Sequence, residues 1–185
     1  IGLVFHPASP RAVEAELARD IALAVPAFVT VVGLFVNRDA EGVRSILERV
    51  PLGMLQFHGE EPAGFCGQFG LPWARAFRVG PGVDLLECEA RFPGAAALLL
   101  DAQVPGQFGG TGTAFDWSLV PRSLSLPVVL SGGLDAGNVG GAIRAVKPWA
   151  VDVSSGVESA RGVKDAARIE EFVRSVRDAD ASAGG

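Results

Sequence analysis

An apolar run that ends on a carboxylate constrains this chain more than any other feature. Residues 97–100, Ala-Leu-Leu-Leu, are followed by Asp101 and then by a glycine-rich stretch from Gly106 to Thr113. A short run with no polar face is typical of a strand buried on both sides in a parallel sheet. The pattern recurs where apolar runs lead into Ser131-Gly132-Gly133 and into Ser154-Ser155-Gly156. Three strands are therefore predicted to end on one acid and two small turns.

Seven such runs alternate with helical patterns along the 185 residues. We expect strands at about 1–5, 28–36, 52–58, 73–79, 96–101, 126–131 and 149–153. The alternation predicts an α/β protein whose parallel sheet is covered by helices. Polar and glycine-rich residues follow nearly every strand. This favours a closed (βα)8 TIM barrel over an open doubly wound sheet, which would gather such residues at one switch point.

The number of strands sets the expected domain organisation. Seven βα units are one short of a barrel's eight, and the chain ends on a helical pattern, so the first βα unit is expected to be absent from the chain. We expect a single barrel domain over residues 1–178, made of the second to eighth βα units, and a small-residue tail over 179–185. Less regular helical patterns lie near 61–70, 83–92 and 116–124. Helix N-caps are expected at Asp39, Asp135 and Asp165.

Composition argues against several classes of function. The chain has 16 Lys and Arg against 21 Asp and Glu, a net charge of -5, whereas nucleic acids and anionic membranes require clustered cations. No apolar run approaches the roughly 20 residues of a membrane span. The two cysteines, Cys66 and Cys88, fit neither a disulfide framework nor a metal-ligand spacing, which indicates a reducing compartment, the cytoplasm. The sequence contains no dinucleotide or Walker glycine motif, and we expect no metal.

Asp101 is the candidate catalytic residue. At the end of a leucine-rich strand, desolvation favours the protonated form of a carboxyl group, which suits a general acid. The alternative is a carboxylate that caps a helix or holds a loop. The neighbouring segment Gly109-Gly110-Thr111-Gly112 favours the catalytic interpretation, because a loop with so few side chains lets its backbone approach a ligand. Gly110 is therefore an expected substrate-binding residue.

The two later turns are candidates for phosphate binding. Gly132-Gly133 and Ser154-Ser155-Gly156 follow the strands that would be the seventh and eighth of a complete barrel. Barrels commonly hold a phosphate there with backbone N–H groups and a helix N-terminus, so no lysine is needed. The alternative is that these glycines only shape tight turns.

Three further polar residues stand near expected strand ends and are candidate substrate-binding residues. Arg11 could bind a substrate carboxylate with its guanidinium fork, although a solvated surface charge is the simpler interpretation. His58 could line the site or exchange protons, and structural histidines are common. Asp152 is expected to bind ligand hydroxyls or to tie neighbouring loops together.

Taken in order along the chain, these segments resemble the phosphoribosylanthranilate isomerase family of tryptophan biosynthesis. The resemblance covers the whole chain and is carried by Gly2–Phe5 with Ser9–Arg11, Val32–Asn37, Leu55–Glu60, Leu99–Asp101, Gly109–Gly112 with Phe115–Trp117, Leu130–Leu134 and Val151–Glu158. It implies a barrel that needs no cofactor. Its reaction would be the Amadori rearrangement of N-(5-phosphoribosyl)anthranilate to 1-(2-carboxyphenylamino)-1-deoxyribulose 5-phosphate.

The resemblance also implies roles for single residues. Asp101 would protonate the furanose ring oxygen, Arg11 would meet the anthranilate carboxylate, and the two turns would hold the phosphate. The family's base is a cysteine at the end of the first strand, and neither Cys66 nor Cys88 occupies a matching position. The expected partner is a small phosphorylated substrate, and the expected state is a monomer or homodimer. A second hypothesis is a non-catalytic barrel fragment that binds a phosphate ligand and lacks the base.

Overall fold

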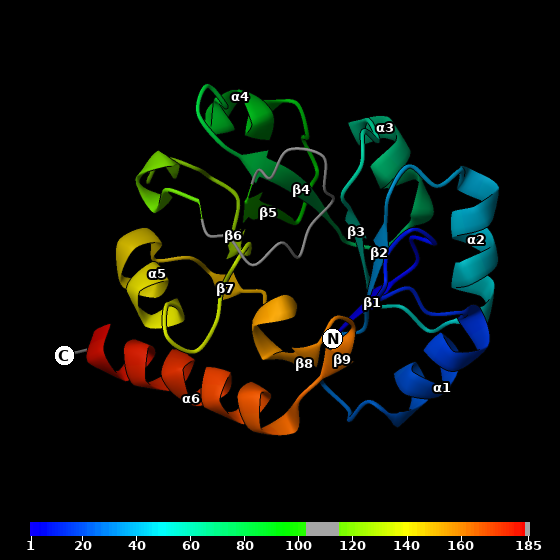
Figure 1. The fold of residues 1–185 in the computed structure, drawn as a ribbon. Helices are drawn as coiled ribbons and strands as arrows, with labels where there is room; N and C mark the ends of the chain where they lie inside the picture. Colours follow the sequence, from blue (N-terminus) through cyan, green and yellow to red (C-terminus); the bar gives the residue numbers. More distant parts are fainter. Residues whose placement is uncertain (103–114, 184–185) are drawn as a thin grey trace. The chain divides into compact units, whose positions relative to one another are not determined.

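The structure, a computed structural model, describes residues 1–102 and 115–183 (Figure 1). The chain forms two compact units, each of which is described by itself. Unit 1 consists of Ile1–Ala76 and Arg91–Ala97, and unit 2 consists of Phe77–Ala90 and the described residues from Leu98 onward.

Unit 1 is a succession of strands and helices. Its elements are β1 (Gly2–Val4), α1 (Ala15–Ala24), β2 (Val32–Phe35), α2 (Ala40–Arg49), β3 (Met54–Phe57), α3 (Ala63–Cys66), the 3-10 turn η1 (Gly67–Phe69) and the first part of β4 (Trp73–Val79). The strands pair in parallel in chain order, β1 with β2, β2 with β3 and β3 with β4. Asp39 caps α2 by accepting a hydrogen bond from the Gly42 N–H at 2.8 Å, as its position in the sequence predicts.

Phenylalanines from successive strands build the core of unit 1. Phe5, Phe35 and Phe57 are at most 3% exposed. The rings of Phe5 and Phe35 stack with centroids 5.3 Å apart, and Phe57 lies 6.1 Å from Phe35. Phe65 and Phe69 close the cluster, 5.9 and 6.0 Å from Phe57. Each such pair adds about 0.5–1.5 kcal/mol to the burial of its rings, so the row anchors the carboxyl ends of β1, β2 and β3.

Unit 2 contains the later strands and the longest helix. Its elements, after the end of β4, are α4 (Leu85–Ala90), β5 (Ala97–Ala102), the 3-10 turn η2 (Trp117–Leu119), β6 (Val128–Leu130), α5 (Val139–Val146), β7 (Ala150–Val151), the 3-10 turn η3 (Ser155–Val157), β8 (Glu158–Ala160), β9 (Val163–Lys164) and α6 (Ala166–Ala183). Strands β5, β6 and β7 pair in parallel in chain order, whereas β8 and β9 form an antiparallel hairpin. All six residues of β5 are buried, as expected of a strand in a parallel sheet.

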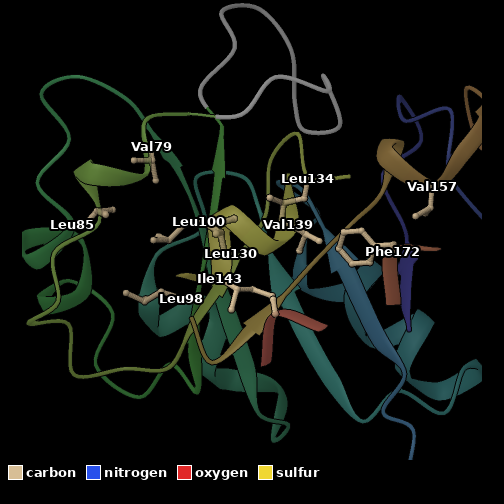
Figure 2. Close-up of a cluster of buried hydrophobic side chains, with 12 residues drawn as sticks. Val79, Leu85, Leu98, Leu100, Leu130, Leu134, Val139, Ile143, Val157 and Phe172 are labelled. Atoms are coloured by element: carbon tan, nitrogen blue, oxygen red, sulfur yellow. The ribbon is translucent and has the colours of Figure 1, made fainter. Parts of the chain in front are cut away.

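Figure 2 shows the apolar cluster that holds unit 2 together. Leu98 and Leu100 of β5 and Leu130 of β6 are completely buried. Helix α5 contributes Val139, also completely buried, and α6 contributes Phe172 at 5% exposure. Full burial of one such side chain stabilises the fold by about 1.5–3 kcal/mol. Because Leu100 is part of this cluster, the position of the next residue, Asp101, is fixed by the core.

The seven strands lie where the sequence predicts them, but several boundaries and helices differ. The helix expected at 116–124 is only η2. The Asp116 side chain accepts hydrogen bonds from the Ser118 N–H and hydroxyl, which favours a turn and lowers the pKa of the Asp116 carboxyl. Pro121 then has no N–H with which to continue a helix.

The C-terminal half shows three further differences. Helix α6 continues through the expected tail as far as Ala183, and Ala179 is buried. Asn138, not Asp135, stands at the N-cap of α5, while the Asp135 carboxylate binds N–H groups in the preceding turn. The hairpin of β8 and β9 was not expected, because its two strands are too short to give a period in the sequence.

Candidate active site

Asp101 lies at the carboxyl end of β5 in unit 2 and is 4% exposed. Its Oδ1 accepts a hydrogen bond from the Ala102 N–H at 2.8 Å. Gly132, in the turn after β6, lies against this carboxylate. A Cβ added to Gly132 would be 2.8 Å from Asp101 Oδ1 and 2.3 Å from the Ala102 nitrogen. The first predicted phosphate turn and the predicted acid are therefore in direct contact.

The two glycine turns also meet each other. A Cβ added to Gly156 would lie 1.9 Å from the Leu134 carbonyl oxygen, so only glycine allows this approach of the two backbones. The turn after β6 is held in turn by Asn138, whose side-chain amide donates to the Gly133 carbonyl at 2.8 Å. The turn after β6 thus contacts both Asp101 and the turn after β7.

Asp152 joins the ends of β6 and β7. It follows β7, and its Oδ2 accepts a hydrogen bond from the Ser131 hydroxyl at 2.9 Å. Its N–H donates to the Leu130 carbonyl at 2.8 Å. One of the two roles expected of Asp152, a tie between loops, is therefore seen, and its contact with a ligand stays a prediction.

Arg11 and His58 belong to unit 1. Arg11 is half-buried in the loop after β1, and its N–H donates to the Ser9 hydroxyl at 3.1 Å. His58 follows β3, is half-buried, and donates its N–H to the Phe35 carbonyl at 2.9 Å. Their roles in binding stay predictions. Gly110 lies outside the described residues.

A buried ion pair organises the strand ends of unit 1. Arg75 within β4 and Glu61 after β3 are 6% and 5% exposed, and Arg75 Nη1 lies 2.9 Å from Glu61 Oε2. The guanidinium also donates to the carbonyls of Phe57 and Gly59. Glu61 accepts hydrogen bonds from the N–H groups of Gly59 and Asn37. The pair therefore fixes the loops after β2 and β3 against β4.

The sequence analysis did not single out this pair. Arg75, within the apolar run 73–79, indicates a buried ion pair, because a buried cation requires an anionic partner. Nothing in the sequence identifies Glu61, rather than the adjacent Glu60, as that partner.

The comparisons with known proteins decide the family. The model of the N-(5'-phosphoribosyl)anthranilate (PRA) isomerase family matches residues 1–175. The chain belongs to this family. The PRA isomerase of Ralstonia pickettii (strain 12J) is 56% identical over 200 residues, covering 100% of this chain and 85% of the relative.

Solved structures agree with this assignment. The PRA isomerase of Thermotoga maritima has a TM-score of 0.85 and 39% identity, over 96% of this chain and 87% of that chain. A PRA isomerase in complex with reduced 1-(o-carboxyphenylamino)-1-deoxyribulose 5-phosphate has a TM-score of 0.83 and 36% identity, over 96% of this chain and 86% of that chain. These similarities confirm the expected fold class, an α/β protein of the (βα)8 TIM barrel type.

In this member of the PRA isomerase family, the Cys66 thiol is unreactive. It is completely buried in α3, and its thiol lies 3.9 Å from the Glu61 carbonyl oxygen. Burial raises the pKa of the Cys66 thiol to about 11, although the nearby Arg75 cation opposes the shift. Because a base must be deprotonated, Cys66 is unsuited to remove a proton near neutral pH.

We expect iodoacetamide at pH 8 to modify the half-buried Cys88 well before Cys66. The thiolate is the reactive form, and the raised pKa leaves little of it at Cys66 until the pH approaches 11. Mass spectrometry of peptides from native and urea-unfolded protein measures both rates. Equal rates at the two cysteines in the native protein would contradict the burial of Cys66.

Replacing Gly132 by Ala should lower the free energy of unfolding by about 2–4 kcal/mol. The clash with the Ala102 backbone accounts for about 1–3 kcal/mol, and the φ of +83° adds about 1 kcal/mol for a residue with a Cβ. Gly137→Ala is the matched control, because its Cβ would meet only the Asp135 carboxylate, at 3.3 Å. Urea unfolding measures both variants. An equal loss of unfolding free energy in Gly132→Ala and Gly137→Ala would show that the turn can shift to accommodate a Cβ at Gly132.

Two surveys of the described residues complete the site. Over residues 1–102 and 115–183, no three His, Cys, Asp or Glu side chains gather as a set of metal ligands. Within the same residues, no helix has the length and apolar character needed to cross a bilayer.

Proposed function

We propose that this chain isomerises N-(5'-phosphoribosyl)anthranilate to 1-(o-carboxyphenylamino)-1-deoxyribulose 5-phosphate, a step of tryptophan biosynthesis. The match of the family model along residues 1–175 carries the assignment. The reaction is an internal redistribution of hydrogen in which nothing is added or lost, so it requires an acid and a base but no oxidant.

Asp101 is the general acid of this proposal. It donates a proton to the furanose ring oxygen while the bond between that oxygen and C1' breaks, and the nitrogen lone pair forms the Schiff base. A base then removes the proton on C2', and the resulting enolamine tautomerises to the ketone. The position of Asp101 supports the role, since the carboxyl group lies at the carboxyl end of β5 and contacts Gly132 of the proposed phosphate turn.

The turns after β6 and β7 hold the substrate phosphate. Gly132 and Gly133 have φ values of +83° and +66°, and Gly156 lies against the Leu134 backbone. Backbone N–H groups of Gly132, Gly133, Ser154, Ser155 and Gly156 can therefore line one anion site without a side chain in the way. The contact between Gly132 and Asp101 supports an anion site next to the acid.

The remaining candidate residues are each proposed to bind another part of the substrate. Arg11 pairs with the anthranilate carboxylate through its guanidinium fork. His58 contacts the substrate, Asp152 binds a ribose hydroxyl while it holds Ser131, and Gly110 binds the substrate through its backbone. No nucleic acid or membrane takes part, the protein acts as a monomer or homodimer, and it works in the cytoplasm without a metal or cofactor.

The test is turnover by the protein. Substrate and product have the same mass, so chromatography must separate them. A parallel titration measures binding of reduced 1-(o-carboxyphenylamino)-1-deoxyribulose 5-phosphate, called here the reduced product analogue, and of its dephosphorylated form. Turnover with a preference for the phosphorylated analogue supports the proposal. Binding without turnover would support the second hypothesis, a non-catalytic phosphate-binding barrel, and no preference for the phosphate would overturn the phosphate site.

A further inference from the structure

Lys164 reaches back from the hairpin to the turn after β7. It lies in β9, and its Nζ donates to the Ser154 carbonyl oxygen at 2.8 Å and to the Ser154 hydroxyl at 3.3 Å. The Val157 N–H reaches the same carbonyl oxygen only at 3.5 Å. The lysine is therefore the stronger hydrogen-bond donor to this carbonyl.

A buried carboxylate holds Lys164 in place. The side chain of Glu158 in β8 is 4% exposed, and its Oε1 lies 2.9 Å from the lysine Nζ. Its Oε2 accepts a hydrogen bond from the Gly162 N–H at 3.1 Å, and the φ of +83° at Gly162 makes the short turn between β8 and β9. Glu158 thus fixes both the shape of the hairpin and the direction of the lysine.

The carbonyl that Lys164 binds belongs to the same rigid peptide unit as the Ser155 N–H. In a planar trans peptide the C=O and N–H point in opposite directions, so a hydrogen bond that fixes one also aims the other. If the peptide turned over, the Ser154 carbonyl would face the anion and repel it. A tether on the carbonyl therefore keeps the Ser155 N–H available as an anion donor.

We infer that Lys164, held by the buried carboxylate of Glu158, is a positioning residue that sets the orientation of the Ser154–Ser155 peptide for phosphate binding. The inference rests on the proposed phosphate site. It assigns Lys164 no contact with the phosphate: the lysine acts through the backbone, and the anion meets the Ser155 N–H.

The test compares binding of the reduced product analogue with binding of its dephosphorylated form. Lys164→Met should weaken binding of the phosphorylated analogue roughly tenfold, the size of one lost hydrogen bond to a charged group, and leave the dephosphorylated analogue unchanged. The Michaelis constant should rise by a similar factor, with kcat nearly constant. Lys147→Met is the matched control, because Lys147 is the other lysine of the chain and is the exposed C-cap residue of α5.

Glu158→Gln separates positioning from direct binding. If Lys164 is a tether, this change also weakens binding of the phosphorylated analogue, and the double variant with Lys164→Met is no weaker than Lys164→Met alone. If Lys164 itself binds the phosphate, freeing it from Glu158 should strengthen binding, which would overturn the inference. Lys164→Arg should retain most of the affinity and serves if the Met variant does not fold.

The wild-type protein distinguishes the two levels of proposal. If it does not prefer the phosphorylated analogue, the phosphate site fails. If it does prefer that analogue and Lys164→Met binds it equally well, the phosphate site stands and the role of Lys164 is wrong.

Discussion

Asp101→Asn should lower kcat by about 10²–10⁴-fold, the usual contribution of a general acid. The amide cannot supply the proton that the departing ring oxygen requires. Its oxygen can still accept the Ala102 N–H, which the carboxylate accepts at 2.8 Å. The fold and the affinity for the reduced product analogue should therefore be nearly unchanged.

Steady-state turnover and a titration with the analogue measure the two effects. Asp180→Asn, on the exposed side of α6, is the matched control and should behave as wild type. Wild-type turnover of the Asp101→Asn variant would exclude Asp101 as the acid. Loss of analogue binding together with loss of turnover would show instead that the carboxylate mainly maintains the site.

Glu61→Gln should lower the free energy of unfolding by about 3–5 kcal/mol, because removing one member of a buried ion pair leaves the other charge uncompensated. The Arg75 guanidinium would remain buried at 6% exposure, above the Phe92 ring at 4.9 Å, without its carboxylate. The new amide would also turn an NH2 group toward one of the two backbone N–H groups that Glu61 now accepts from.

Urea unfolding followed by circular dichroism measures this loss. Glu60→Gln is the matched control, since Glu60 is exposed and adjacent, and surface changes of this kind usually stay within about 0.5 kcal/mol. A loss of less than about 1 kcal/mol at Glu61 would mean that water reaches the guanidinium and replaces the carboxylate.

Local sequence patterns were sufficient to predict the strands. Each of the seven apolar runs became a strand, because a run buried on both faces has few other stable conformations. The helix expected at 116–124 failed for a local reason as well, since Asp116 and Pro121 favour a turn. The extension of α6 to Ala183 had no such local signal, and the burial of Ala179 in the core accounts for it.

The candidate site also has features that the sequence predicted and features that it did not. The sequence located Asp101 at a strand end and the two glycine turns after the following strands, and the structure brings these three features together in unit 2. The sequence could not reveal that Gly156 lies against Leu134, because that contact joins backbones 22 positions apart and depends on how β6 and β7 pair.

By itself the sequence determined the order of the elements, the strand-end residues and the family resemblance, all of which depend on residue type and spacing. Only the tertiary structure decided which charges pair. Arg75 selected Glu61 over the adjacent Glu60, and Lys164 joined Glu158 to the Ser154 carbonyl. The physical reason is that a charged side chain leaves water only where the fold supplies an opposite charge and oriented dipoles. Such a partner is set by position in space, which residue spacing along the chain does not encode.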